Sequence, residues 1–142
     1  MVSGPQISLK NLSLSFGEEL IFDNLNLLIH PRDRIALIGR NGSGKSTLLK
    51  VLQGLVAQDE GDRMLRKGLS IGYMEQDPNL SEFSTLYDYV FSGVLESNLH
   101  LIEMTGQSLG VDLETSVVAS SGGERRRAAI TKLNAGNHDI ML

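Results

Sequence analysis

The stretch Gly-Arg-Asn-Gly-Ser-Gly-Lys-Ser at positions 39–46 constrains the fold of this chain more than any other feature. It matches the pattern G-x-x-x-x-G-K-[ST] at every specified position. The apolar residues 35–38 precede it and predict a short strand that is buried on both faces. Apolar residues at helical spacing follow Lys45 and predict a helix that ends near Gly54. A strand, a glycine-rich loop and a helix in this order indicate a phosphate-binding loop (P-loop) in an α/β fold.

The residue types of this loop suit a nucleoside triphosphate, and most of all ATP. Glycines let backbone N–H groups turn toward an anion, and the N-terminus of the following helix adds a positive dipole end. Lys45 supplies a charge for the β- and γ-phosphates, and the hydroxyl of Ser46 can ligate Mg²⁺. A glycine-rich turn that merely caps a helix is the alternative. The predicted nucleotide-binding residues of the loop are Gly39, Asn41, Gly42, Ser43, Gly44, Lys45, Ser46 and Thr47.

Length and composition are those of one globular domain. The chain has 142 residues, 41% of them hydrophobic, and no cysteine. No apolar run approaches the roughly 18 residues of a membrane span, and the N-terminus does not resemble a secretory signal, so we expect a cytoplasmic protein. The formal charge of −4 argues against nucleic-acid binding by the domain as a whole.

Periodicity along the rest of the chain extends the α/β pattern. Alternating or continuous apolar residues predict strands, and apolar residues three or four apart predict helices. Strands are expected at residues 7–9 and 12–16, 25–29 and 69–74, and at the start of 139–142. Helices are expected over residues 86–102, before a break at 106–110, and over 124–133.

A second motif, Ser-Gly-Gly-Glu at positions 121–124, precedes the last predicted helix. Ser121 can cap that helix with Glu124 in its first turn, and the Ser-Gly-Gly donors could meet a phosphate. A simple helix cap is the alternative for this segment taken alone. A glutamine at position 76, in Tyr-Met-Glu-Gln-Asp-Pro, lies between the two motifs. The three motifs in this order resemble those of the ATP-binding cassette (ABC) ATPases.

The resemblance implies roles for individual residues. Phe16 matches the aromatic residue that stacks on adenine in the family; an apolar strand end in the core is the alternative. Gln76 matches the residue that reaches Mg²⁺ and the attacking water, which makes it the candidate catalytic residue. The candidate metal ligands are Ser46 and Gln76. The segment Ser121, Gly122, Gly123 and Glu124 matches the signature that contacts ATP held by an opposite protomer. The implied partner is therefore a second cassette.

Two departures from the family pattern stand out. Ser120 occupies a position where the family usually has leucine, so we expect looser packing behind the signature. The run Asp-Ile-Met-Leu at positions 139–142 looks like the start of the Walker B strand, and we expect the chain to stop before the Mg²⁺-ligating Asp, the catalytic Glu and the switch His. The expected fold is an ABC-type domain with an incomplete core sheet and a shortened helical subdomain. Within a single partial domain, 1–142, we expect a β-rich core at 1–78, the helical subdomain at 79–123 and the signature helix at 124–142.

Residues 35–50 and the ending Gln-Asp-Pro at 76–78 look like the soluble F subfamily, whose members carry two cassettes and are associated with translation and the ribosome. A nucleotide-binding subunit of a transporter, and a nucleotide-binding module without turnover, remain alternatives. Arg125, Arg126 and Arg127 could contact phosphates, but we interpret them as a solvated charge run.

Overall fold

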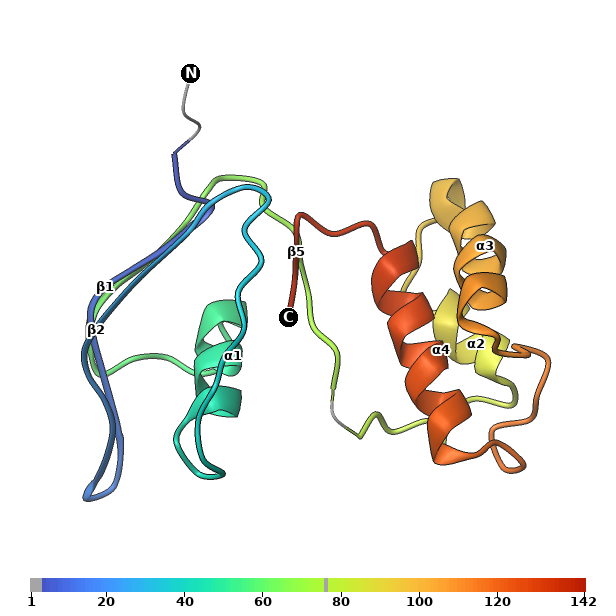
Figure 1. Ribbon diagram of the computed structural model, residues 1–142, viewed down its shortest axis with the longest axis horizontal. Coiled ribbons are helices and arrows are strands. Elements are labelled where there is room, and N and C mark those ends of the chain that lie inside the picture. The colour runs from blue at the N-terminus through green and yellow to red at the C-terminus, as the bar shows by residue number, and fades with distance from the viewer. Residues whose placement is uncertain (1–3, 76) are drawn as a thin grey trace. The chain divides into compact units, whose positions relative to one another are not determined.

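The computed structural model describes residues 4–75 and 77–142. The chain divides into two compact units, Met1–Leu69 and Ser70–Leu142. Each unit has its own helices and strands (Figure 1). The expected limits at residues 78 and 123 stay predictions.

The first unit contains a three-stranded antiparallel sheet in the order β2-β1-β3. Strand β1 (Ile7–Phe16) and strand β2 (Glu19–Ile29) form a hairpin around Gly17, and β3 (Glu60–Leu65) pairs with the other edge of β1. The strands predicted at 7–9 and 12–16 are both confirmed as parts of β1, and the strand predicted at 25–29 is confirmed as the end of the longer β2. Strand β3 was not expected, because its sequence Glu-Gly-Asp-Arg-Met-Leu is mostly polar and lacks an apolar alternation.

Helix α1 (Lys45–Gln53) lies beside this sheet and ends at Gly54, as predicted (Figure 1). Its apolar face and the inner face of β1 bury the largest side chains of the unit. Arg63 of β3 holds the end of the helix, because one of its Nη atoms donates to the carbonyl of Leu52 at 2.6 Å. The buried hydrophobic residues of the unit are Ile7, Leu9, Leu12, Leu14, Ile29, Leu48, Val51 and Leu52.

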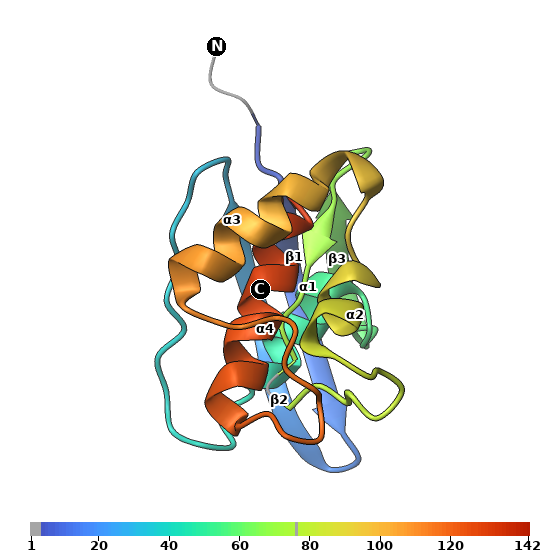
Figure 2. The same ribbon diagram turned by 90° about the vertical axis from the view of Figure 1, so that its right-hand side faces the viewer.

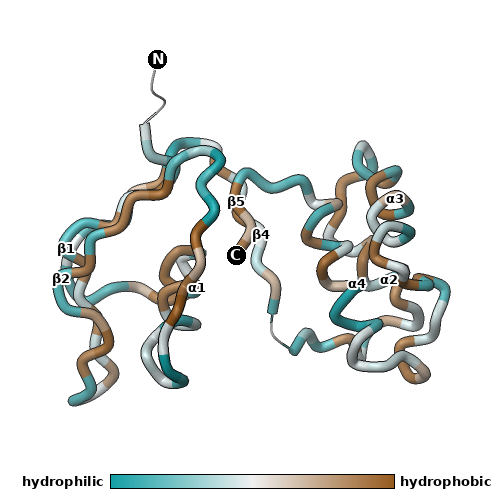
Figure 3. Tube along the Cα trace, viewed as in Figure 1, coloured by the Kyte–Doolittle hydropathy of each residue, from teal (hydrophilic) through white to brown (hydrophobic). Residues whose placement is uncertain are grey.

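The apolar segment 35–38 is not a strand in the structure, so the expected buried strand before the P-loop is wrong. The segment is hydrophobic in Figure 3, yet Ile35 is 50% exposed and Ile38 is 93% exposed. A strand requires a hydrogen-bonded neighbour. Within the described part of the first unit, the sheet is made by β1, β2 and β3, and no strand pairs with residues 35–38.

The second unit is a group of helices. It contains α2 (Leu86–Phe91), the 3₁₀ turn η1 (Glu96–Asn98), α3 (Leu99–Leu109) and α4 (Gly122–Ala135). Helix α3 lies against α4 in both views (Figures 1 and 2). The single helix expected over 86–102 is therefore two helices and a turn, whereas the helix expected over 124–133 is confirmed and extends at both ends.

The helices enclose the core of the second unit. Tyr87, Tyr89 and Phe91 lie on α2, and the ring of Tyr87 stacks on that of Phe91 with centroids 6.0 Å apart. The fully or nearly buried members of the core are Leu80, Leu86, Val90, Ile102, Val111, Val117, Ala128 and Ala135.

Two short strands, β4 (Ile71–Gly72) and β5 (Ile140–Met141), pair in parallel at the two ends of this unit's chain. The side chain of Asp139 accepts hydrogen bonds from the backbone N–H and the hydroxyl of Ser70 at 2.9 and 3.1 Å. Both predicted strands therefore exist but are shorter than expected. No helix within residues 4–75 or 77–142 has the length and apolar character needed to cross a membrane.

Candidate nucleotide-binding site

The glycines of the P-loop take a backbone conformation that other residues rarely adopt. Gly42 and Gly44 have φ angles of 81° and 86°. Gly44 also needs its small size, because a Cβ atom there would lie 2.9 Å from Cγ2 of Ile21 and 3.1 Å from a ring carbon of Phe22 on β2. The loop is therefore shaped by its own dihedral angles and by close packing on β2.

Lys45 lies with its ammonium group inside the loop. Its Nζ donates to the carbonyl oxygens of Gly39 and Arg40, each at 2.6 Å, and lies 3.5 Å from Oγ of Ser43. The charge is thus held among oxygen acceptors in the position where the motif needs a cation. Phosphate oxygens are stronger acceptors for an ammonium than neutral carbonyls are, because the hydrogen bond is then charge-assisted on both sides.

Helix α1 begins directly at this loop. Its N-cap is Gly44, which has no side chain and so makes no side-chain cap hydrogen bond. The first N–H groups of a helix have no partner inside the helix and carry its positive dipole end. Ser46 is exposed in the first turn and Thr47 follows it, half-buried. The loop, Lys45 and the helix N-terminus therefore lie together, in an arrangement that suits an anion.

The other residues expected around a nucleotide are placed less completely. Phe16 ends β1, is 52% exposed and pairs with Glu19 across the hairpin, so it is not part of the buried core. It belongs to the same unit as the P-loop. Gln76 lies outside the described residues, and its expected role stays a prediction.

The signature segment, residues 121–124, forms the N-terminal turn of α4. Ser121 is the N-cap, and its hydroxyl oxygen accepts from the N–H of Glu124 at 3.2 Å. The carboxylate of Glu124 accepts from the N–H and the hydroxyl of Ser121 at 2.8 and 2.7 Å. This reciprocal arrangement is the predicted capping box. Gly122 and Gly123 are both exposed.

Charge in this segment is set by the same hydrogen bonds. The side-chain and backbone hydrogen bonds from Ser121 lower the pKa of Glu124, and nearby Arg127 lowers it further. Glu124 is therefore ionised at neutral pH, and its carboxylate accepts the hydrogen bond that the hydroxyl of Ser121 can donate.

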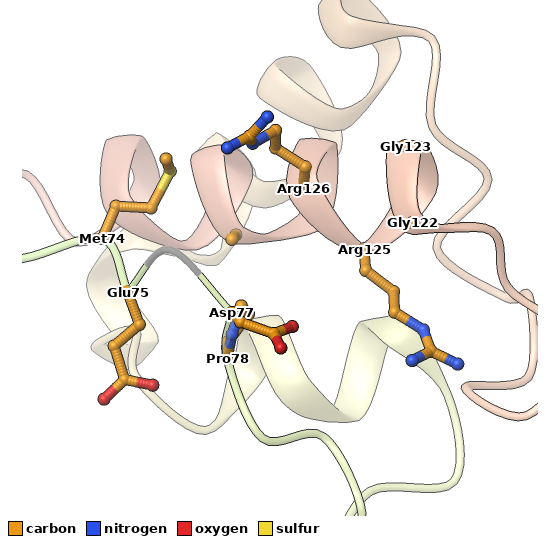
Figure 4. Close-up of a pocket in the computed structure, with 9 residues that line it drawn as sticks. Met74, Glu75, Asp77, Pro78, Gly122, Gly123, Arg125 and Arg126 are labelled. Atoms are coloured by element: carbon orange, nitrogen blue, oxygen red, sulfur yellow. The ribbon is translucent and has the colours of Figure 1, made fainter. Parts of the chain in front are cut away.

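A pocket of about 470 Å³ adjoins the start of α4 in the second unit (Figure 4). Its walls carry charges of both signs, since Glu75 and Asp77 lie on the chain before α2 and Arg125 and Arg126 lie on α4. The segment around the expected glutamine and the signature helix thus border one cavity. Its remaining lining residues are Met74, Pro78, Gly122, Gly123 and Ala129.

The structure changes the interpretation of the three arginines. Arg126 is exposed, as expected for a solvated charge, but Arg125 and Arg127 are half-buried. Arg125 donates from Nε to Oγ of Ser120 at 3.0 Å and from Nη2 to the carbonyl of Val117 at 2.9 Å. Sequence reasoning missed this interaction. The one sequence feature that pointed to this hydrogen bond was the polar residue Ser120, which we had interpreted as a cause of looser packing.

Comparison with known proteins agrees with the motifs. The family model described as ABC transporter matches residues 22–142. ATP-binding protein Uup of Caulobacter vibrioides is 37% identical over 139 residues, which are 97% of this chain and 22% of that protein. Uup of Haemophilus influenzae is 43% identical over 176 residues, covering 96% of this chain and 27% of that protein. Energy-dependent translational throttle protein EttA of Mycobacterium tuberculosis is 27% identical over 176 residues, covering 95% and 32%. The chain thus spans about a fifth to a third of these relatives.

Solved structures support the fold alone, because their sequence identities are low. A metal-chelate type ABC transporter in an inward-facing conformation has a TM-score of 0.80 at 24% identity, covering 98% of this chain and 59% of that chain. An Atm1-family ABC exporter has a TM-score of 0.82 at 21% identity, covering 99% and 29%. The predicted α/β nucleotide-binding fold is confirmed. This chain belongs to the ABC family, whose model matches residues 22–142.

Proposed function

We propose that this chain binds ATP through the P-loop, residues 39–46, as part of an ABC ATPase that couples ATP binding and hydrolysis to the pairing of two cassettes. The observation that supports this most is the position of Lys45. Its ammonium donates to the loop's own carbonyl oxygens, beside a helix N-terminus whose N-cap is a glycine without a side-chain cap. A triphosphate replaces the carbonyl acceptors and adds charge-assisted hydrogen bonds.

Magnesium fits this site as an ion shared with the nucleotide. Among the described residues, no group of three or more His, Asp or Glu side chains could hold a metal by itself. Mg²⁺ commonly binds through one or two protein oxygens together with substrate phosphates. The exposed hydroxyl of Ser46 is placed to be one of those ligands, and Gln76 is the other proposed one. The bound ion would neutralise phosphate charge.

Phe16 is the proposed contact for the adenine base. Its side chain is half exposed at the end of the β1–β2 hairpin, where an aromatic ring gains little from the core. A base stacked on such a ring removes from water one face of the base and one face of the ring. This contact would explain why the exposed end of a strand carries a phenylalanine.

The signature segment is proposed to contact the ATP of a second cassette. Gly122 is the first residue of α4. A Cβ atom at Gly122 would meet nothing within 4 Å, so packing inside this chain does not require a glycine there. Close approach of a partner's phosphate to the backbone does require one. Residues 1–142 are proposed to be one partial cassette in this arrangement.

The relatives suggest the setting in which this ATPase acts. EttA is named an energy-dependent translational throttle protein. By analogy with it, we propose a cytoplasmic role in translation, with the ribosome as a partner. The runner-up is a transporter subunit, which the description of the matching family model leaves as the competing assignment.

The Mg²⁺ dependence of ATP binding tests the proposal. Calorimetry of the folded chain with ATP and Mg²⁺ should give saturable binding, and the variant Ser46→Ala should weaken binding more in Mg²⁺ than in a chelator. Thr47→Ala, at the next position, serves as the comparison. Absence of saturable ATP binding, or an Mg²⁺-independent loss in Ser46→Ala, would contradict the proposed site.

A further inference from the structure

We propose that Arg125 is a positioning residue that fixes the turn leading into the signature segment. This inference rests on the proposed function, in which that segment contacts a partner's ATP. The guanidinium of Arg125 bridges two groups of the chain just before the segment, Oγ of Ser120 and the carbonyl of Val117, at 3.0 and 2.9 Å. Ser120 itself donates from Oγ to the same carbonyl at 2.7 Å. The three groups form a closed set of hydrogen bonds.

One end of this set is anchored in the core. Val117 is buried among the helices of the second unit, and its N–H donates to the carbonyl of Ser84, just before α2, at 3.0 Å. Ser120 is buried as well, at 8% exposed. Arg125 therefore connects a fixed point of the core to the residue that directly precedes Ser121.

The chemistry explains why an arginine suits this position. The hydroxyl hydrogen of Ser120 is used on Val117, so Oγ offers only its lone pairs and needs a donor. The planar fork of Arg125 supplies donors in two directions, whereas a lysine ammonium is a single point charge. The serine at position 120 is therefore matched by Arg125, and it does not simply leave the packing looser.

The signature turn is thus held from two sides. The carboxylate of Glu124 accepts a hydrogen bond from the N–H of Ser121, and Nε of Arg125 donates one to Oγ of Ser120. Loss of Arg125 leaves the capping box intact, because none of its hydrogen bonds involves that side chain. The expected defect is a loosened turn on an otherwise folded α4, with poorer alignment of the exposed Gly122 and Gly123.

Arg126 provides the matched control. It carries the same charge at the next position and lines the same pocket, but it is exposed. Figure 4 shows the side chains of Arg125 and Arg126 leaving α4 on opposite sides. A simple charge effect on a phosphate would act through either residue, whereas the proposed positioning effect requires Arg125.

The experiment compares Arg125→Ala, Arg125→Lys, Ser120→Ala and Arg126→Ala in the 142-residue chain. Amide hydrogen exchange reports the signature turn, with α3 as an internal reference, and sedimentation velocity reports ATP-dependent self-association. Arg125→Ala and Ser120→Ala should speed exchange at residues 120–123 about tenfold or more and weaken association by a similar factor. A double variant, Arg125→Ala with Ser120→Ala, should lose less than the sum of the two single losses, because the two side chains share one of their hydrogen bonds. Arg125→Lys should not restore the wild-type values, and Arg126→Ala should match the wild type.

ATP affinity at the P-loop, measured by calorimetry, separates this inference from the proposed function. It should stay within about twofold in all four variants, because Lys45 lies in the other unit. A wild type that fails to bind ATP overturns the proposed function itself. A wild type that binds ATP but never self-associates overturns the positioning role, as does an Arg125→Ala variant that behaves like Arg126→Ala in exchange or association.

Discussion

Ser121 and Glu124 bind each other reciprocally at the N-terminus of α4. The carboxylate of Glu124 accepts from both the N–H and the hydroxyl of Ser121, at 2.8 and 2.7 Å, while the N–H of Glu124 donates to the serine oxygen at 3.2 Å. The serine hydroxyl is therefore engaged within its own chain. A phosphate from a partner must compete with Glu124 for that hydrogen, or must use the backbone N–H groups of the turn.

This relationship predicts a pH dependence of stability. The pKa of Glu124 is lowered in the folded state, chiefly by its hydrogen bonds from Ser121. A lowered carboxyl pKa means that the unfolded state binds the proton more readily, so the contribution is present above about pH 4.3 and is lost as pH falls further. Urea unfolding of wild type and Glu124→Gln should show a wild-type advantage at pH 7 that disappears below the folded pKa.

The quantity to compare at each pH is the difference in the free energy of unfolding between wild type and Glu124→Gln, because other carboxylates also titrate in this range. Glu114→Gln is a suitable control, since Glu114 lies outside the capping box. Parallel pH profiles of wild type and Glu124→Gln would show that the capping box does not bind the carboxylate more tightly than the protonated acid.

A comparison of substitutions at Gly44 and Gly42 distinguishes the effect of packing from the effect of backbone strain in the P-loop. Both have positive φ, but only Gly44 lacks space for a Cβ atom, since Ile21 and Phe22 lie against it, whereas a Cβ atom at Gly42 would meet nothing within 4 Å. Gly44→Ala should therefore lower the free energy of unfolding by about 1 kcal/mol more than Gly42→Ala. Thermal or urea unfolding measures this. Equal losses would mean that β2 does not shape the loop.

Phe16→Ala should weaken ATP binding while leaving the affinity for inorganic triphosphate almost unchanged. Stacking of a base on an aromatic ring is worth about 1–3 kcal/mol. Calorimetry with both ligands measures the difference, and Leu20→Ala, at another exposed apolar residue of the same hairpin, is the control. An equal loss for both ligands would show that Phe16 acts through the fold.

Lys132 links α4 to α2 through aromatic rings. Its Nζ lies 4.3 Å from the ring centroid of Tyr89 and 3.0 Å from Oγ of Ser92, to which it donates. Lys132→Met keeps the apolar stem and removes the ammonium, so we expect a loss of about 1 kcal/mol in the free energy of unfolding. The exposed Lys67, changed to Met, should have almost no effect. A neutral Lys132→Met would mean that the cation contributes nothing to joining these helices.

The sequence predicted those parts of the site that depend on neighbouring residues. The P-loop, its helix from Lys45 to Gly54 and the capping box of Ser121 and Glu124 all involve residues within a few positions of each other. Their dihedral angles, caps and periodicity are local properties, which is why pattern and structure agree.

The parts that failed depend on distant segments. Strand β3 is polar and exists because it pairs with β1, some fifty positions earlier in the chain. The helix expected over 86–102 ends at Phe91, two residues before Gly93, where a Cβ atom would collide with the side chain of Lys132 from α4. Residues 35–38 are apolar enough for a buried strand but have no strand beside them in the described part of the first unit. Such pairings cannot be read from local periodicity.

The measurement that tests the central claim most directly is ATP binding by Lys45→Ala. Calorimetry of the folded wild type with ATP and Mg²⁺ should give saturable binding, and the variant should lose about 10- to 1000-fold in affinity, because it removes a charge that hydrogen-bonds to phosphate. Lys50→Ala, on the exposed side of the same helix, should bind ATP like the wild type. Unchanged affinity in a folded Lys45→Ala variant would contradict the assignment of ATP to the P-loop.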